Sequence, residues 1–186
     1  MTKVLVIQGS GMNMRGKSQV EIFGPTTLEQ MNEQILGYAE GLGIDVELFH
    51  SNIEGEVVNA IYDAYERKFD AALINPAGYT TTAGTLRAAI TQVGFPFIEV
   101  HASNPTARGT VSTVLPVCKG SVYGFGVYGY YLGLEAVKHM SEGQYHSKCK
   151  PKATAALSLI QLPHGEICPF PPQGGKARLG AVPPPR

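Results

Sequence analysis

A regular alternation of strand-like and helix-like segments runs from residue 3 to residue 140 of this chain. Short apolar runs rich in β-branched residues predict strands over residues 3–8, 44–49, 71–74, 96–100 and 121–127. Apolar residues at helical spacing predict helices between them, over residues 28–42, 56–69, 82–93 and 130–140. Strands that are joined through helices run parallel, and right-handed crossovers place the helices on both faces of the sheet. The alternation therefore predicts an α/β fold.

Five predicted strands indicate a flavodoxin-like three-layer sandwich, with a five-stranded parallel sheet between two layers of helices. The first long helix has a start signal in Thr26-Thr27-Leu28-Glu29. There the Thr26 hydroxyl and the Glu29 carboxylate are expected to bind amides of the first turn as a capping box. Gly43 is placed to end that helix.

The distribution of prolines divides the chain into two regions. Residues 1–142 contain five of the thirteen prolines, and the other eight lie in residues 143–186. A proline-rich segment without apolar periodicity does not build a packed core. We expect residues 1–142 to form the folded domain and residues 143–186 to form a tail, partly ordered or docked on a neighbouring subunit.

The composition narrows the range of partners and compartments. Fifteen basic and fifteen acidic side chains cancel, which argues against nucleic acid or a membrane surface as the main partner. Three scattered cysteines, Cys118, Cys149 and Cys168, indicate reduced thiols in a cytoplasmic protein. The histidines outside the central region have no metal-ligand spacing, and the loop at residues 9–24 lacks both the Rossmann glycines and a Walker lysine. Neither a metal nor a cofactor is expected.

Polar residues follow several of the predicted strands. In parallel α/β sheets ligands bind outside the carboxyl ends of the strands. The loops to inspect are therefore residues 9–24, 51–55, 75–82 and 101–112, which are rich in amide and hydroxyl side chains. Together they predict a pocket for a small, polar and anionic ligand.

These strand ends carry a resemblance to a known family. The matching strings include Thr26-Thr27-Leu28-Glu29, Ser51-Asn52, Ile74-Asn75-Pro76, Glu99-Val100-His101 and Ser103-Asn104, in colinear order between residues 3 and 140. They resemble type II 3-dehydroquinate dehydratase, a small flavodoxin-like lyase. The resemblance implies a homo-oligomer, built in the family from trimers that can pair into dodecamers, and a small carboxylated ligand.

The resemblance also implies roles for particular residues. In the family a loop tyrosine removes a proton beside a ketone, and a histidine protonates the leaving hydroxyl group in an anti elimination through an enolate. His101 matches that general acid, and Glu99 matches the residue that orients it. Asn75 matches a hydroxyl-binding side chain, and Ala102 and Ser103 match the backbone amides that hold the carboxylate. Glu54 also matches a family position.

Other family positions are occupied by different residue types. Phe23 stands where the family has its catalytic tyrosine, and Ser18 stands where it has the loop arginine that lowers the pKa of that tyrosine. Further binding positions fall on Gly11, Thr81, Ala88 and Ser112. A phenyl ring cannot accept a proton, and losing a general base lowers a rate by about 10²–10⁴. The expected function is a diverged family member with weak or absent dehydratase activity and a pocket for a small cyclic or carboxylated ligand.

Two alternative functions stay open. The chain could be a working dehydratase with a displaced base, because Arg15 and Lys17 lie in the first loop and Tyr79 lies on a facing one. It could also be a non-catalytic oligomeric binding or scaffold protein. If the protein is catalytic, His101 would act as the acid or base with Glu99 behind it, in the elimination or hydrolysis of a related polar ring compound.

The individual site residues also have structural interpretations. His101 could be a core histidine satisfied by Glu99, and Asn75 could cap a turn before Pro76. Arg108 could contact the ligand or form a structural or intersubunit ion pair, and Phe23 could be a lid over the pocket or a loop anchor. Four late tyrosines are predicted to serve the core and interfaces and not the chemistry: Tyr123, Tyr128, Tyr130 and Tyr131.

Overall fold

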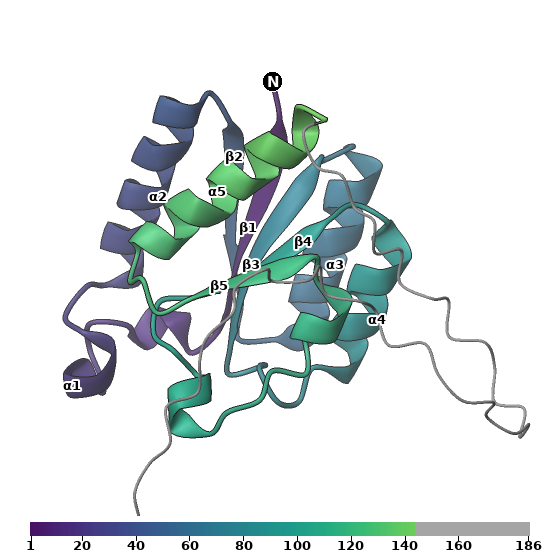
Figure 1. Cartoon of the computed structure of the whole chain (residues 1–186). Helices are drawn as coiled ribbons and strands as arrows, with labels where there is room; N and C mark the ends of the chain where they lie inside the picture. Colours follow the sequence, from purple (N-terminus) through teal and green to yellow (C-terminus); the bar gives the residue numbers. More distant parts are fainter. Residues whose placement is uncertain (144–186) are drawn as a thin grey trace, which may run out of the picture. The chain divides into compact units, whose positions relative to one another are not determined.

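A single parallel sheet organises the fold in the computed structural model of the chain, which describes residues 1–143 (Figure 1). Its strands are β1 (Lys3–Ser10), β2 (Asp45–His50), β3 (Ala71–Ala77), β4 (Phe97–His101) and β5 (Gly120–Tyr123). Their order in the sheet is β2-β1-β3-β4-β5, and every neighbouring pair is parallel. The predicted five-stranded α/β fold is confirmed.

Helices cover both faces of the sheet (Figure 1). The structure contains α1 (Val20–Phe23), α2 (Leu28–Leu42), α3 (Glu54–Glu66), α4 (Gly84–Val93) and α5 (Tyr128–Ser141). The α2 and α5 helices lie side by side on one face, and α3 and α4 pack on the other.

Alternation along β1 divides the apolar core into two layers. Leu5 and Ile7 pack against buried residues of α3 and α4, whereas Val4 and Val6 pack against buried residues of α2 and α5. Successive side chains of a strand point to opposite faces, so a strand that is covered on both sides is apolar at every position. The continuous run of apolar residues in β1 is the consequence.

Several predicted boundaries differ from the structure. The capping box is made by Thr27 and Gln30, because Thr27 is the last extended residue and its hydroxyl accepts the Gln30 amide, while the Gln30 side chain accepts the Thr27 amide. The predicted strand at residues 121–127 ends at Tyr123, because Gly124 and Gly126 adopt positive φ values of 86° and 60° and turn the chain towards α5. The α3 helix begins at Glu54, before the predicted residue 56, and α4 begins at Gly84, after the predicted residue 82.

The first and third strands approach each other closely where they end. A Cβ atom on Gly9 would lie 2.2 Å from the carbonyl oxygen of Pro76, so no larger residue fits there. The Gly78 amide donates a hydrogen bond of 2.9 Å to the Ser10 carbonyl. This contact fixes the loops after β1 and β3 against each other at the carboxyl edge of the sheet.

The predicted tail at residues 143–186 lies outside the described residues, apart from its first residue. Within the described part of the chain, no helix has the length and apolar character needed to cross a membrane.

Candidate functional site

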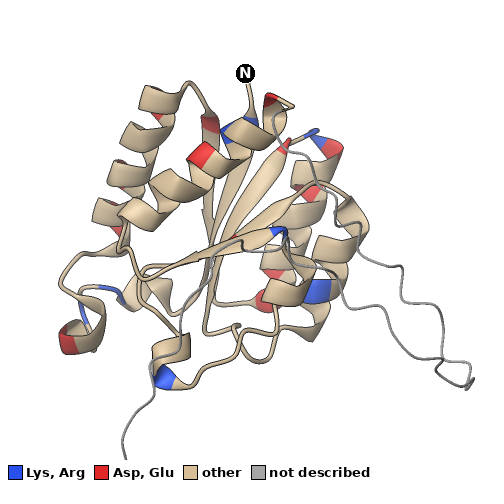
Figure 2. Ribbon diagram, in the orientation of Figure 1, with Lys and Arg blue, Asp and Glu red and all other residues tan. Residues whose placement is uncertain are grey.

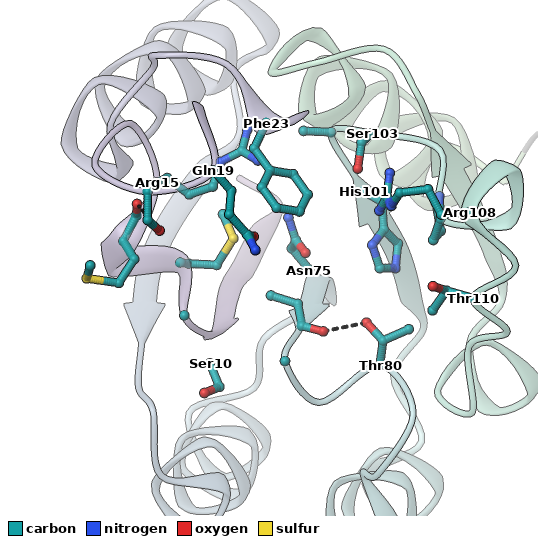
Figure 3. A pocket seen from close by; sticks show the side chains of 18 of the residues that line it. Ser10, Arg15, Gln19, Phe23, Asn75, Thr80, His101, Ser103, Arg108 and Thr110 are labelled. Carbon is teal, nitrogen blue, oxygen red and sulfur yellow. Dashed lines mark hydrogen bonds between the residues drawn. The ribbon is translucent and has the colours of Figure 1, made fainter. Parts of the chain in front are cut away.

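A cavity of about 500 Å³ opens at the carboxyl edge of the sheet. Its walls come from the loops after β1, β3 and β4, together with α1 (Figure 3). Asn75, His101, Ala102, Ser103, Arg108 and Phe23, which are the predicted ligand-contacting residues other than Glu99, all line it. The predicted site residues therefore converge on one place.

His101 ends β4 and is held from behind by Glu99. The His101 Nε2 atom lies 2.6 Å from Glu99 Oε1, and both side chains are buried. An ionised carboxylate only accepts hydrogen bonds, so Nε2 carries the proton and Nδ1 is the nitrogen that neutral His101 offers to the cavity. His101 thus has the carboxylate partner of a core histidine and also a place in the wall of the cavity.

Glu99 has three hydrogen-bond donors around it. Besides His101, it accepts from the Tyr123 hydroxyl at 2.8 Å and from the Ser112 hydroxyl at 2.8 Å. The His101 and Tyr123 rings also meet edge to face, with 4.9 Å between their centroids. A fully buried carboxylate is tolerated only when such partners replace its water. Glu99 is therefore a fixed support for His101.

Tyr123 is protonated at neutral pH in this arrangement. Burial of the phenol, followed by its hydrogen bond to Glu99, raises the pKa of Tyr123 well above its usual range. It can therefore act only as a donor to Glu99. The sequence had indicated a core or interface role for Tyr123 and gave no sign of this contact, because Tyr123 and Glu99 meet only when β4 and β5 pair.

Asn75 reaches the cavity from the end of β3 and is oriented by a buried chain of polar groups. Its Nδ2 atom donates to the Tyr130 hydroxyl at 2.9 Å, and that hydroxyl donates to Gln8 Oε1 at 2.7 Å. Burial raises the pKa of Tyr130 to about 12. The bond to Tyr130 uses one of the two N–H groups of Asn75, so its Oδ1 atom and its second N–H can bind a ligand hydroxyl.

Phe23 lies between two arginines at the mouth of the cavity. The Cζ atom of Arg15 is 5.1 Å from the centroid of the Phe23 ring, and the Cζ atom of Arg108 is 5.5 Å from it. Figure 3 shows Phe23 between the labelled Arg15 and Gln19 on one side and His101 and Arg108 on the other. Position 23 therefore belongs to the site, and the side chain there has no group that can exchange a proton.

Two other predicted residues have structural contacts instead. Glu54 accepts hydrogen bonds from the Thr85 hydroxyl at 2.7 Å and the Leu86 amide at 2.9 Å, so it caps the start of α4. The Tyr79 hydroxyl donates to the Ser51 carbonyl at 3.2 Å and does not line the cavity. The structure thus gives Tyr79 a structural contact and does not place it in the cavity wall.

Some contributors to the site were not found from the sequence. The sequence identifies Arg15 only as a residue of the first loop and Ser112 only as a family binding position, whereas the structure places Arg15 in the cavity wall and the Ser112 hydroxyl on Glu99. Gln8 and Tyr130 have the sequence pattern of ordinary strand and helix residues. The one indication of their role is that each is a polar residue at a position whose spacing predicts burial. Among the described residues, no group of three or more His, Cys, Asp or Glu side chains could hold a metal ion.

Comparisons with known proteins agree with this geometry. A family model described as Dehydroquinase class II matches residues 2–138. The 3-dehydroquinate dehydratase of Caldanaerobacter subterraneus is 43% identical over 145 residues, which cover 76% of this chain and 97% of that enzyme. The 3-dehydroquinate dehydratase of Caldicellulosiruptor bescii is 41% identical over 143 residues, which cover 75% of this chain and 99% of that enzyme.

Solved structures give the same result. The type II dehydroquinase of Butyrivibrio crossotus superposes with a TM-score of 0.70 at 33% identity, covering 73% of this chain and 97% of that one. A 3-dehydroquinate dehydratase-like protein from Bifidobacterium longum superposes with a TM-score of 0.59 at 30% identity, covering 76% of this chain and 98% of that one. From its strand order, the position of its cavity and these matches, the chain belongs to the class II dehydroquinase family.

Proposed function

We propose that this protein is a diverged member of its family that binds a small cyclic or carboxylated ligand and has weak or absent 3-dehydroquinate dehydratase activity. The observation that carries this proposal is the Phe23 ring at the cavity, where the family reaction requires a proton acceptor. Arg15, His101 and Arg108 are the ionisable side chains among the described residues that line the cavity. Arginine stays protonated, so His101 is the side chain among these three that can exchange a proton.

A single proton-exchanging group is a poor basis for the family reaction. As the resemblance implies, that reaction uses one group to take the proton beside the ketone and another to protonate the leaving hydroxyl. His101 can serve one of these steps, with its Nε2 atom held 2.6 Å from Glu99 Oε1. The other step then depends on water, which accounts for an expected loss of about 10²–10⁴ in rate.

Restoring the hydroxyl group tests the proposal. Dehydration of 3-dehydroquinate would be measured for the parent, the Phe23→Tyr variant and the Phe23→Leu variant, with the Caldanaerobacter subterraneus relative alongside. The guanidinium groups of Arg15 and Arg108 would lower the pKa of the new phenol, because nearby cations favour the phenolate. We expect Phe23→Tyr to raise kcat/KM by about tenfold or more, and Phe23→Leu to give no gain.

Two outcomes would contradict this proposal. Parent turnover within about tenfold of the relative would mean that the base has been replaced elsewhere, the alternative of a working dehydratase. An unchanged rate in Phe23→Tyr would mean that the missing hydroxyl is not the reason for low activity. If neither protein nor variant turned over any ring compound while ligand binding persisted, a non-catalytic binding protein would be the better description.

The proposal includes self-association in a cytoplasmic protein. Apolar side chains such as Ile53, Phe125 and Tyr128 are half or more exposed in the single chain, and burial between subunits would remove them from water. Light scattering coupled to gel filtration would test the trimer-based assembly that the family resemblance implies. A monomeric mass would contradict it.

A further inference from the structure

We propose that the cavity selects a ring compound with two anionic groups, one held by Arg15 and the other by Arg108 beside the Ala102–Ser103 segment. This inference rests on the proposed function only in taking the cavity as the site of a carboxylated ring ligand. It adds the number of charges on that ligand and assigns a binding role to Arg15.

Arg15 is a half-buried cation that has no anionic partner among residues 1–143. Its Nε atom is buried and makes no hydrogen bond, and burial lowers the pKa of its guanidinium. The ion pairs within residues 1–143 involve Arg67 and His101, and none involves Arg15. Partial removal of a cation from water costs free energy unless an opposite charge is near. An anionic group of the ligand at this end of the cavity would supply that charge.

Arg108 provides a second cation on a different wall. It ends the short 3₁₀ helix Thr106–Arg108 after β4, and its Nη1 atom donates to the Asn104 carbonyl at 3.3 Å. No described carboxylate lies within ion-pair distance of it. Ala102 and Ser103, which precede it in the same loop, also line the cavity. A carboxylate at this end would therefore meet both Arg108 and the backbone of the loop.

Phe23 packs against both guanidinium groups. Both lie near the same phenyl ring, at 5.1 Å and 5.5 Å from its centroid. A guanidinium that packs against an aromatic ring keeps its N–H donors pointing outward in its own plane, the arrangement that binds a carboxylate through two hydrogen bonds. Where the family has a proton acceptor, this chain thus has a phenyl ring that supports two anion-binding groups.

The charge around the cavity fits a dianion better than a monoanion. No aspartate or glutamate is among its described lining residues, and Glu99, behind His101, is already bonded to three donors. Figure 2 shows basic residues in the loop that leads into α1. The acidic residue of α1, Glu21, is exposed to solvent and does not line the cavity. A monoanion would leave one guanidinium without a counter-charge.

Calorimetric titration with three ring compounds of matched size tests the inference. Isophthalate carries two carboxylates, benzoate carries one, and isophthalamide carries none. We expect the full-length protein to bind isophthalate about tenfold or more tightly than benzoate, and isophthalamide more weakly than either. Raising the salt concentration should weaken the binding of isophthalate more than that of benzoate. This comparison needs no substitution in the protein.

Variants then assign the two charges. Arg15→Met should lower the isophthalate affinity by about tenfold and leave the benzoate affinity nearly unchanged, whereas Arg108→Met should weaken both. Arg87→Met is the matched control, because Arg87 is exposed on α4 and does not line this cavity. Equal affinities of the parent for isophthalate and benzoate, or equal losses for both ligands in Arg15→Met, would overturn the inference and leave the proposed function standing. Absence of binding by every carboxylate would overturn both.

Discussion

Tyr123 donates a hydrogen bond of 2.8 Å to the same Glu99 oxygen that lies 2.6 Å from His101 Nε2. A shared acceptor couples the two side chains, because the oxygen atom that orients the histidine is itself oriented by the phenol. Ser112 holds the other carboxylate oxygen at 2.8 Å, so neither oxygen of Glu99 can rotate freely. The position of His101 in the cavity thus depends on Tyr123 and Ser112, which bind the two oxygen atoms of Glu99.

Removal of the Tyr123 hydroxyl is expected to destabilise the protein and loosen His101. In Tyr123→Phe the buried Glu99 Oε1 atom keeps His101 as its partner but loses one of its two hydrogen bonds, and a hydrogen bond to a charged group is worth roughly 1.5–3 kcal/mol. Urea unfolding would measure this loss as a lower midpoint with an unchanged slope. The control is Tyr62→Phe, which removes a hydroxyl group that bonds to Gln92 at 2.6 Å on the exposed surface. Equal losses in the two variants would contradict the proposed importance of the Glu99 contact.

The sequence predicted the fold more completely than the site because the two depend on different kinds of information. The burial of β1 on both faces and the helical spacing of α2 follow from local periodicity, which is visible in one chain. His101 and Asn75 could be placed because they follow strands directly. The support of Glu99 by Ser112 and Tyr123 joins residues 13 and 24 positions away, so it depends on the packing of β5 and the preceding loop. Local patterns cannot predict such contacts.

Replacing Ala77, which lies at the end of β3 on the cavity wall, by glycine is expected to make the protein more stable. It has a φ angle of 46°, in the left-handed region where a Cβ atom costs roughly 1–2 kcal/mol. Ala77→Gly relieves that strain, and after the entropy cost of glycine the free energy of unfolding should rise by about 0.5–1 kcal/mol.

A second alanine gives the matched control for this substitution. Ala60 lies within the regular helix α3, where glycine should lower the free energy of unfolding by about 1 kcal/mol. Thermal and urea unfolding of Ala77→Gly and Ala60→Gly should therefore shift in opposite directions. A loss of stability in both variants would show that the left-handed conformation at residue 77 is not strained.

Cys118 is expected to resist alkylation in the folded protein. Burial, with a smaller contribution from the nearby Glu99 carboxylate, raises the pKa of its thiol to about 12. The thiolate is the reactive form, so iodoacetamide at mildly alkaline pH should modify Cys118 far more slowly in native protein than in urea. Peptide mass spectrometry would follow this site separately from the other cysteines. Rapid modification under native conditions would mean that the segment around Cys118 opens readily.

Tyr130 should make the protein lose stability at high pH. Burial raises the pKa of its phenol from 10.0 to about 12, so between these pH values the unfolded chain has released this proton and the native chain still holds it. The unfolded state then binds fewer protons, and the free energy of unfolding falls with rising pH by up to about 1.4 kcal/mol per pH unit for this one group. In Tyr130→Phe that contribution disappears. The variant should be less stable than the parent at neutral pH by roughly 1–3 kcal/mol, because Gln8 and Asn75 lose their shared partner. Above pH 10, however, its free energy of unfolding should fall less steeply than that of the parent. Urea unfolding at a series of alkaline pH values would measure both slopes, and parallel slopes for parent and variant would show that Tyr130 ionises as readily in the native protein as in the unfolded chain.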